Sequence, residues 1–248
     1  DFHKPWNIGV TPDRRIQARI DELNAILTPI LGVQVGKSTV QVPRSDVCGR
    51  VDGRLCESLI GDVATDSMRT AFDSVPGFDV DFAITNAGGL RAALTCPTTD
   101  SPTDFCLADL YPFPAGQFPI TLGQVVTVLP FGNVVATAQI SGTQLKTMLE
   151  NGVSQMPNAN GRFAQVSGLC FTYDISAAAG NRVTGVLEAG ADGSCPLGSP
   201  VVGLGAGDSH LVAINDFMAF GGDGYPNLVS QLNTPSVKTM DARLADYI

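Results

Sequence analysis

The chain has 248 residues and a net charge of −9, and 44% of its residues are hydrophobic while 16% are charged. This length allows one large domain or two small ones, and the apolar fraction supports a substantial core, which argues against a disordered chain. The acidic balance, without any Lys/Arg cluster, argues against nucleic-acid binding through a basic face, and no apolar run approaches the ~20 residues that span a bilayer.

The first third of the chain is predicted to contain two helices and two strands. Thr11, Pro12 and Asp13 are typical of a helix start, and Gly32 closes a segment in which apolar residues recur at close to the helical period. The elements expected up to residue 85 are an arm over 1–11, a helix over 12–31, a strand over 33–42, a glycine-containing loop over 48–54, a helix over 55–72 and a buried strand over 80–85.

The remainder of the chain mixes strands and helices. Ser141 to Gln144 is predicted to start a helix with an apolar inward face. The further elements expected are an irregular segment over 95–120, strands over 125–129 and 133–140, a helix over 141–151, strands over 169–174 and 183–187, a glycine-rich loop over 201–207 and a strand over 211–214. The order lacks a regular βαβ alternation, which predicts an α+β fold.

The six cysteines are an even number, which favours disulfides. Metal ligation is the alternative, but no C-x-x-C spacing is present and the chain has only two histidines. Two pairs are separated by short loops, and the third follows by elimination, although six cysteines allow 15 connectivities. The predicted pairs are Cys48–Cys56, Cys96–Cys106 and Cys170–Cys195. Three disulfides would indicate an oxidising compartment.

A glycine-rich turn between Asn215 and Pro226 carries a carboxylate, Asp223, six residues after an aromatic, Phe217. Glycines allow positive φ and the close approach of a ligand. A carboxylate held there can accept hydrogen bonds from ribose hydroxyls, and an aromatic ring can offer its face to a planar base. The alternative is a tight turn with a solvated carboxylate and a phenyl ring in the core.

Three further motifs precede this turn in the chain. Asn86-Ala87-Gly88-Gly89-Leu90-Arg91 follows an apolar run, Leu129-Pro130-Phe131-Gly132-Asn133 comes next, and Gly161 to Leu169 comes third. In this order the four motifs resemble the C-terminal, nucleotide-binding domain of the secreted 5′-nucleotidase family, which includes ecto-5′-nucleotidases and periplasmic UDP-sugar hydrolases. The resemblance extends from about Arg54 to Tyr225, and it implies the α+β fold of that domain, with mixed sheets and packed helices, preceded by a linker helix.

The resemblance implies a substrate-binding site made of two aromatic side chains, three polar or basic ones and one acidic one. In the family, two aromatics clamp the base, the acidic residue holds the ribose hydroxyls, and the arginines and asparagine contact sugar and phosphate. The matching residues are Arg54, Asn86, Arg91, Phe131, Phe217 and Asp223.

Each of these residues also has an ordinary structural alternative. The two phenyl rings could belong to the core, and Asn86 could simply tolerate a left-handed turn. Arg54 could pair with Glu57 on a helix surface, and Arg91 could pair with Asp81.

The resemblance also implies how the chain is organised. Residues 1–32 are expected to be an arm and linker helix, and residues 33–248 the substrate-binding domain. In the family, hydrolysis is performed by a separate N-terminal metallophosphoesterase domain with two divalent metal ions. This chain has two histidines in total and no G-N-H-[DE] stretch, so we expect it to hold no catalytic residue, metal or cofactor.

The expected function is therefore the substrate-binding half of a secreted, periplasmic or cell-surface 5′-nucleotidase-type hydrolase that dephosphorylates nucleotides. Its expected partners are a nucleoside or nucleotide and the N-terminal metallophosphoesterase domain, with no nucleic acid and no membrane span. The alternative is a stand-alone extracellular module that binds a nucleoside, a nucleotide or another partner without catalysis.

Overall fold

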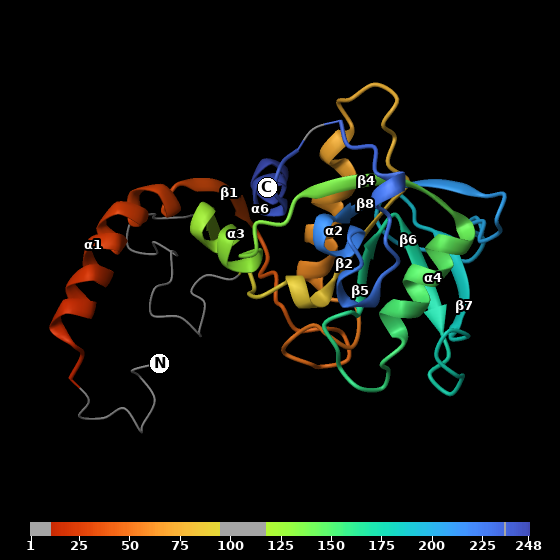
Figure 1. Ribbon diagram of the computed structural model, residues 1–248, viewed down its shortest axis with the longest axis horizontal. Helices are drawn as coiled ribbons and strands as arrows, with labels where there is room; N and C mark the ends of the chain where they lie inside the picture. Colours follow the sequence, from red (N-terminus) through yellow and green to blue (C-terminus); the bar gives the residue numbers. More distant parts are fainter. Residues whose placement is uncertain (1–10, 95–117, 236) are drawn as a thin grey trace.

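The computed structural model describes residues 11–94, 118–235 and 237–248, which form an α+β fold around a mixed sheet (Figure 1). The helices are α1 (Arg14–Leu31), α2 (Leu59–Arg69), α3 (Leu122–Val128), α4 (Gly142–Val153), α5 (Asp216–Ala219) and α6 (Met240–Tyr247). The strands are β1 (Gln34–Ser38), β2 (Phe82–Asn86), β3 (Phe118–Thr121), β4 (Val135–Ser141), β5 (Ala164–Ser167), β6 (Leu169–Tyr173), β7 (Val183–Glu188) and β8 (Ser209–Asn215).

The central sheet has four strands in the order β4-β8-β2-β5. β2 and β8 run parallel, whereas the outer pairs β4–β8 and β2–β5 are antiparallel. Two-stranded antiparallel pairs, β1–β3 and β6–β7, complete the strand content of the described residues. The predicted α+β class is confirmed.

Both faces of the central sheet are covered, because its strands are apolar on both sides. On one face Phe82 and Ile84 pack with α4, and on the other Ala83 packs with α2, α3 and α6. The alternation follows from the two-residue period of a strand. Glu150 of α4 is buried, and its carboxylate accepts hydrogen bonds from the backbone N–H groups of Arg182, just before β7, and Val183, its first residue, each over 2.9 Å.

Helix α1 extends away from the body of the molecule (Figure 1). It begins where the sequence predicts, because Asp13 caps it by accepting hydrogen bonds from the N–H groups of Arg15 and Ile16 over 2.9 and 3.3 Å. None of its residues is buried. The division of the chain at residue 32 stays a prediction.

Helix α3 replaces a predicted strand. Residues 125–129 are apolar and were expected to be extended, but Leu122–Val128 is helical. Thr121 and Gln124 form a capping box, in which the Thr121 hydroxyl accepts from the Gln124 N–H and the Gln124 side chain accepts from the Thr121 N–H. The strand prediction was wrong because a short apolar run has no period that separates a buried strand from a buried helix.

Other boundaries also differ from the sequence expectation. The helix predicted over 55–72 starts later, at Leu59 with Ser58 as its N-cap, and ends in a 3-10 turn. The end of the segment predicted as irregular over 95–120 forms β3, while its residues 95–117 lie outside the described part of the chain. β5 and α6 were not predicted.

Two of the three predicted disulfides are formed. Cys48–Cys56 closes the loop before α2, and Cys170–Cys195 joins β6 to the segment after β7. The predicted pair Cys96–Cys106 lies outside the described residues. The Cys48–Cys56 loop is further organised by the buried Asp46, whose carboxylate accepts hydrogen bonds from three backbone N–H groups within it.

Candidate functional site

A pocket of about 390 Å³ lies where the turns that follow β2 and β8 meet. Because β2 and β8 are adjacent parallel strands, their carboxyl ends reach the same edge of the sheet, and the two motif-bearing turns emerge side by side. The pocket is lined by Arg54, Asn86, Gly88, Gly89, Phe131, Asn133, Gly161, Phe217 and Asp223. The fold thus brings five of the six predicted site residues into one pocket.

A chain of hydrogen bonds fixes the polar side of this pocket. Asn86 Nδ2 donates to Asp223 Oδ2 over 2.8 Å, and Asn215 Nδ2 donates to Asn86 Oδ1 over 3.0 Å. Asn215 is buried at the end of β8 and also donates to Thr85 Oγ1 over 3.0 Å. Asn86 therefore orients the Asp223 carboxylate, and Asn215 orients Asn86.

The Asp223 turn has an uncommon backbone. Asp223 has φ +53°, in the left-handed region that non-glycine residues adopt rarely, and such conformations concentrate at functional sites. Asn151 of α4 donates through Nδ2 to the Asp223 carbonyl over 3.2 Å, and the buried Tyr225 donates through its hydroxyl to the Arg162 carbonyl over 2.8 Å. Contacts on both sides of Asp223 hold this conformation.

The apolar side of the pocket is formed by Phe131 and Phe217. These two residues are 60% and 43% exposed, so neither belongs to the core, and that alternative is wrong. A Cβ atom at Gly222 would lie 2.5 Å from Phe217 Cζ, so glycine is needed for the turn to lie against this ring. Two phenyl rings that line one pocket from an exposed position are available to a planar ligand.

Arg91 is the predicted residue that does not line the pocket directly. Its guanidinium Cζ lies 5.8 Å from the centroid of the Phe131 ring, within reach of a cation–π contact. Among the described residues, no ion pair joins Arg91 to Asp81, and the Asp81 carboxylate accepts from the Leu211 N–H over 2.8 Å. Among the described residues, no ion pair joins Arg54 to Glu57 either.

Four residues that line the pocket were not predicted as site residues, namely Gly88, Gly89, Asn133 and Gly161. Asn133 ends the Leu129–Asn133 motif, and its Nδ2 donates to Asp216 Oδ1 over 2.8 Å. Gly161 accepts from the Gly88 N–H through its carbonyl over 2.7 Å, which brings the loop before β5 against the pocket. All four residues stand inside the conspicuous motifs of the sequence, so their position in those motifs was the available signal.

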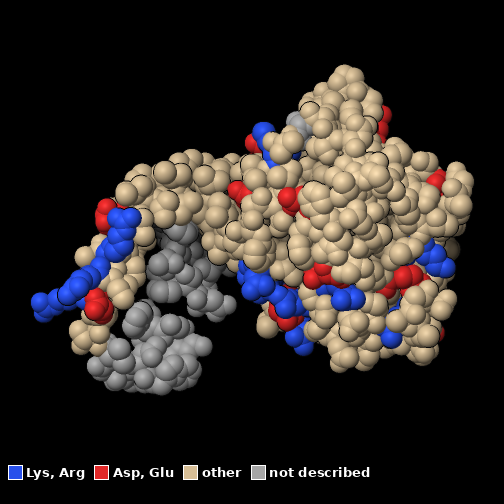
Figure 2. Space-filling model, in the orientation of Figure 1, with Lys and Arg blue, Asp and Glu red and all other residues tan. Residues whose placement is uncertain are grey.

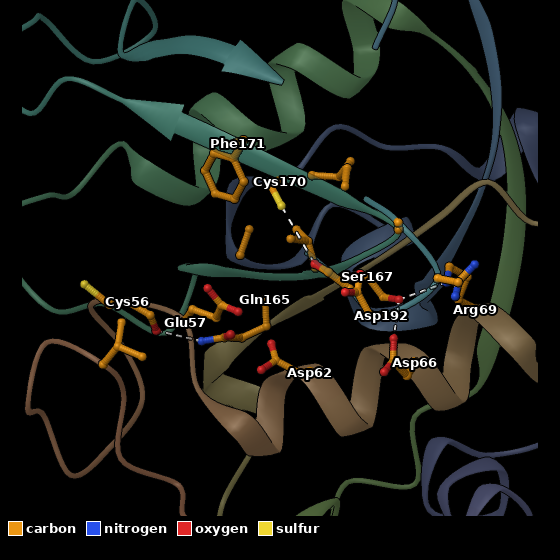
Figure 3. Close-up of a pocket in the computed structure, with 18 of the residues that line it drawn as sticks. Cys56, Glu57, Asp62, Asp66, Arg69, Gln165, Ser167, Cys170, Phe171 and Asp192 are labelled. Atoms are coloured by element: carbon orange, nitrogen blue, oxygen red, sulfur yellow. Dashed lines mark hydrogen bonds between the residues drawn. The ribbon is translucent and has the colours of Figure 1, made fainter. Parts of the chain in front are cut away.

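A second pocket, of about 690 Å³, lies between α2, β5 and β6 (Figure 3). Asp62 and Asp66 project into it from α2, and Phe171 faces it from β6 (Figure 3). Arg69 Nε donates to Ser167 Oγ over 2.9 Å, and that hydroxyl donates to the Asp66 carboxylate. Although this pocket is larger, none of the predicted site residues lines it.

The carboxyl of Asp62 is unusual in this second pocket. Burial raises the pKa of Asp62 to about 7, and the nearby carboxylates of Glu57 and Asp66 contribute in the same direction. Loss of water around a carboxylate and the negative charges of its neighbours both disfavour its ionised form, so it binds a proton more tightly.

The described residues do not fit a divalent metal centre. In residues 11–94, 118–235 and 237–248, no three His, Cys, Asp or Glu side chains are placed to hold a metal ion. A two-metal phosphatase site requires several such ligands around each ion.

Within the same ranges, no helix is both long and apolar enough to cross a bilayer.

Known proteins share these features of sequence and fold. The family model described as 5′-nucleotidase, C-terminal domain, matches residues 34–230. The chain is 32% identical over 172 residues to the trifunctional nucleotide phosphoesterase protein YfkN of Bacillus subtilis, which covers 69% of this chain and 10% of that protein. It is 26% identical over 243 residues to the snake venom 5′-nucleotidase of Crotalus adamanteus, which covers 98% of this chain and 38% of that protein.

The fold is also similar to that of a solved 5′-nucleotidase structure. The 5′-nucleotidase precursor from Thermus thermophilus superimposes with a TM-score of 0.70 and 27% identity, over 96% of this chain and 40% of that one. The chain therefore spans between a tenth and two fifths of the length of these three proteins. The matched range includes every segment that lines the 390 Å³ pocket.

Proposed function

Because this chain belongs to the 5′-nucleotidase C-terminal domain family, we propose that its 390 Å³ pocket binds the nucleoside part of a nucleotide. The chain would be the substrate-binding half of a secreted, metal-dependent 5′-nucleotidase-type hydrolase. The observation that carries this proposal is the Asp223 carboxylate, oriented by Asn86 beside two half-exposed phenyl rings.

The two phenyl rings suit a nucleobase. A base between Phe131 and Phe217 would exclude water from both of its faces, and each aromatic contact contributes ~0.5–1.5 kcal/mol beyond the buried area. Stacking needs only a planar π surface, so this side of the pocket would accept different bases.

The Asp223 carboxylate suits a ribose. One oxygen already accepts from Asn86 Nδ2, which leaves acceptor capacity for the two vicinal hydroxyls of a ribose. Hydrogen bonds to an ionised acceptor are stronger than those between neutral groups. The pocket would therefore prefer ribonucleosides over ligands without 2′ and 3′ hydroxyls.

The hydrolytic step would belong to a separate N-terminal metallophosphoesterase domain with two divalent metal ions. The donor groups of the described residues do not converge on a metal, so no step of the reaction is assigned to this chain. We expect the 248-residue chain to release no phosphate from AMP, with or without Mn²⁺ or Zn²⁺.

Secretion is proposed on two grounds. The described residues contain two disulfides, which persist mainly in oxidising compartments. A relative that matches 98% of the chain is a venom protein.

Calorimetry with adenosine tests the proposal without any metal. Phe217→Ala removes one stacking face and is expected to cost ~1–3 kcal/mol, a loss of about 5- to 150-fold in affinity. Phe220→Ala is the matched control, because this phenyl ring is 60% exposed on the same turn but does not line the pocket. Equal affinity in wild type and Phe217→Ala would refute the stacking role.

The ribose contact has its own test. Asp223→Asn retains a residue that tolerates the left-handed backbone while it removes the charged acceptor. Its affinity for adenosine is expected to fall by more than its affinity for 2′,3′-dideoxyadenosine. Equal losses for the two ligands would remove Asp223 from ribose recognition.

A further inference from the structure

The loop that carries Arg54 is tied to the central sheet by a buried side chain, Gln165 of β5. Gln165 is 1% exposed. Its Nε2 donates to the Gly53 carbonyl over 3.2 Å and to the Cys56 carbonyl over 2.9 Å, and the second of these bonds is drawn in Figure 3. Its Oε1 accepts from the Ser58 N–H over 3.2 Å. The Gln165 amide therefore holds the chain on both sides of Arg54.

These three bonds use the whole amide group of Gln165. A glutamine amide has two N–H donors and one carbonyl oxygen, and here each of them has a backbone partner. If the amide were reversed, its NH2 group would face the Ser58 N–H and its oxygen would face two carbonyls. An apolar side chain at this position would leave all three backbone groups without this partner, which is costly for buried groups.

Gln165 also relates the Arg54 loop to the polar side of the 390 Å³ pocket. In the antiparallel pair β2–β5 it stands opposite Thr85, the residue before Asn86. In the loop before β5, the Asn160 N–H donates to the Arg54 carbonyl over 3.2 Å. β5 and the loop before it therefore set Arg54 relative to the strand that ends at Asn86.

The Arg54 side chain lacks a comparable restraint of its own. Its buried Nε has no hydrogen-bond partner within the described ranges, and no ion pair there involves it. Arg50 of the same loop, by contrast, donates to both carboxylate oxygens of Asp52, each over 2.9 Å. In Figure 2, Lys and Arg side chains lie together on the surface over the loop that joins β1 to α2. Because an arginine side chain has high rotamer freedom, the place of the Arg54 guanidinium depends on where the backbone of this loop is held.

We propose that Gln165 is a positioning residue that holds Arg54 in the wall of the 390 Å³ pocket through the backbone of residues 53–58. This inference rests on the proposed function, since it concerns how the pocket is prepared for a nucleotide. Gln165 lines the larger pocket and not the smaller one, so its effect on a ligand in the smaller pocket passes through the loop. A loop that is already held in place loses less conformational freedom when the ligand binds.

Isothermal calorimetry on the 248-residue chain, with AMP as the probe and no metal, tests this coupling in single and double variants. Gln165→Met keeps the length of the side chain but removes all three hydrogen bonds, and it is expected to weaken AMP about 10-fold. Arg54→Ala is expected to weaken AMP by at least as much. In the Arg54→Ala background, Gln165→Met should weaken AMP by less than about 2-fold, because the residue that it positions is gone.

Ser167→Ala is the matched control. Ser167 lies two residues further along β5, is also buried and lines the same larger pocket. Its hydroxyl bonds to Arg69 and Asp66 rather than to the Arg54 loop, so this variant should leave the affinity for AMP unchanged.

Thermal unfolding of each variant verifies that the fold is intact. If Gln165→Met does not fold, Gln165→Glu takes its place in the same comparison, because a protonated carboxyl of the same length keeps one acceptor and one donor. Its loss of AMP affinity is expected to be smaller and to disappear in the Arg54→Ala background.

The outcomes separate this inference from the proposal on which it rests. If wild type binds neither AMP nor adenosine, the proposed function itself fails. If Arg54→Ala binds AMP as wild type does, Gln165 has nothing to position, and this inference alone is refuted. If the folded Gln165 variant binds AMP as wild type does, weakens AMP equally with and without Arg54, or loses no more than Ser167→Ala, Gln165 serves the fold and does not position Arg54.

Discussion

Replacement of Asp62 by asparagine is expected to stabilise the protein at pH 8 and to leave its stability near pH 4 almost unchanged. Asp62 lies in the first turn of α2, half-buried in the larger pocket with Glu57 and Asp66 nearby. Burial, followed by these two carboxylates, raises the pKa of Asp62 from an ordinary 3.8 to about 7. Asparagine has nearly the same shape but does not ionise.

The sign of the effect follows from proton linkage. A group with a raised pKa in the folded state binds its proton more tightly there than in the unfolded chain. Its contribution to the free energy of unfolding is fully present below pH 3.8 and is lost as the pH rises through about 7. At about 1.4 kcal/mol per pKa unit, the full rise in the pKa of Asp62 would correspond to roughly 4 kcal/mol of lost stability. Water screens a partly exposed carboxyl, so we expect Asp62→Asn to raise the free energy of unfolding at pH 8 by about 1–2 kcal/mol.

Urea unfolding of wild type and Asp62→Asn at pH 4, 6 and 8 measures this difference directly. Asp73→Asn serves as the control, because Asp73 is an exposed carboxylate just beyond α2. The stability difference between Asp62→Asn and wild type should grow with pH, whereas that of the control should not. A difference that is independent of pH, or a variant less stable than wild type at pH 8, would refute the electrostatic reasoning.

Three further predictions concern packing and covalent structure. Gly61→Ala should lower the free energy of unfolding, measured in urea, by about 1–3 kcal/mol, because its Cβ would lie 2.4 Å from Oε1 of the buried Gln165. Gly207→Ala is the control and should have little effect, because a Cβ atom there would meet no atom within 4 Å. Glu150→Gln should cost about 1–3 kcal/mol, because an amide offers a single acceptor oxygen to the two backbone N–H groups of Arg182 and Val183; full stability of this variant would contradict that role. Thiol titration of the denatured, unreduced protein should find no free thiol, and a peptide map with Cys170 or Cys195 unpaired would contradict the disulfide.

Several local features were determined by the sequence alone, because they depend on neighbours in the chain. Asp13 followed by apolar residues at helical period is sufficient to define α1, since capping and period act within a few turns. Ser141 and Gln144 likewise form the capping box that starts α4. The motifs that contain Asn86 and Asp223 could be recognised from residue order, which is why most of the side chains that line the smaller pocket could be named before the fold was known.

Other features were decided only by tertiary structure. Val125 and Val128 are buried in one cluster with residues of α2 and α6, and the apolar content of residues 125–129 does not reveal that they pack as one face of a helix. The raised pKa of Asp62 depends on its burial in the pocket that residues of β5 and β6 also line. These strands are distant in the sequence, so the residues next to Asp62 in the chain do not reveal this burial.

The pocket itself exists because β2 and β8, about 130 residues apart in the chain, pair in parallel and release their turns at the same edge of the sheet. Local sequence specifies capping and period, but a site formed by distant segments requires the burial of both faces of the sheet, which only the whole fold provides.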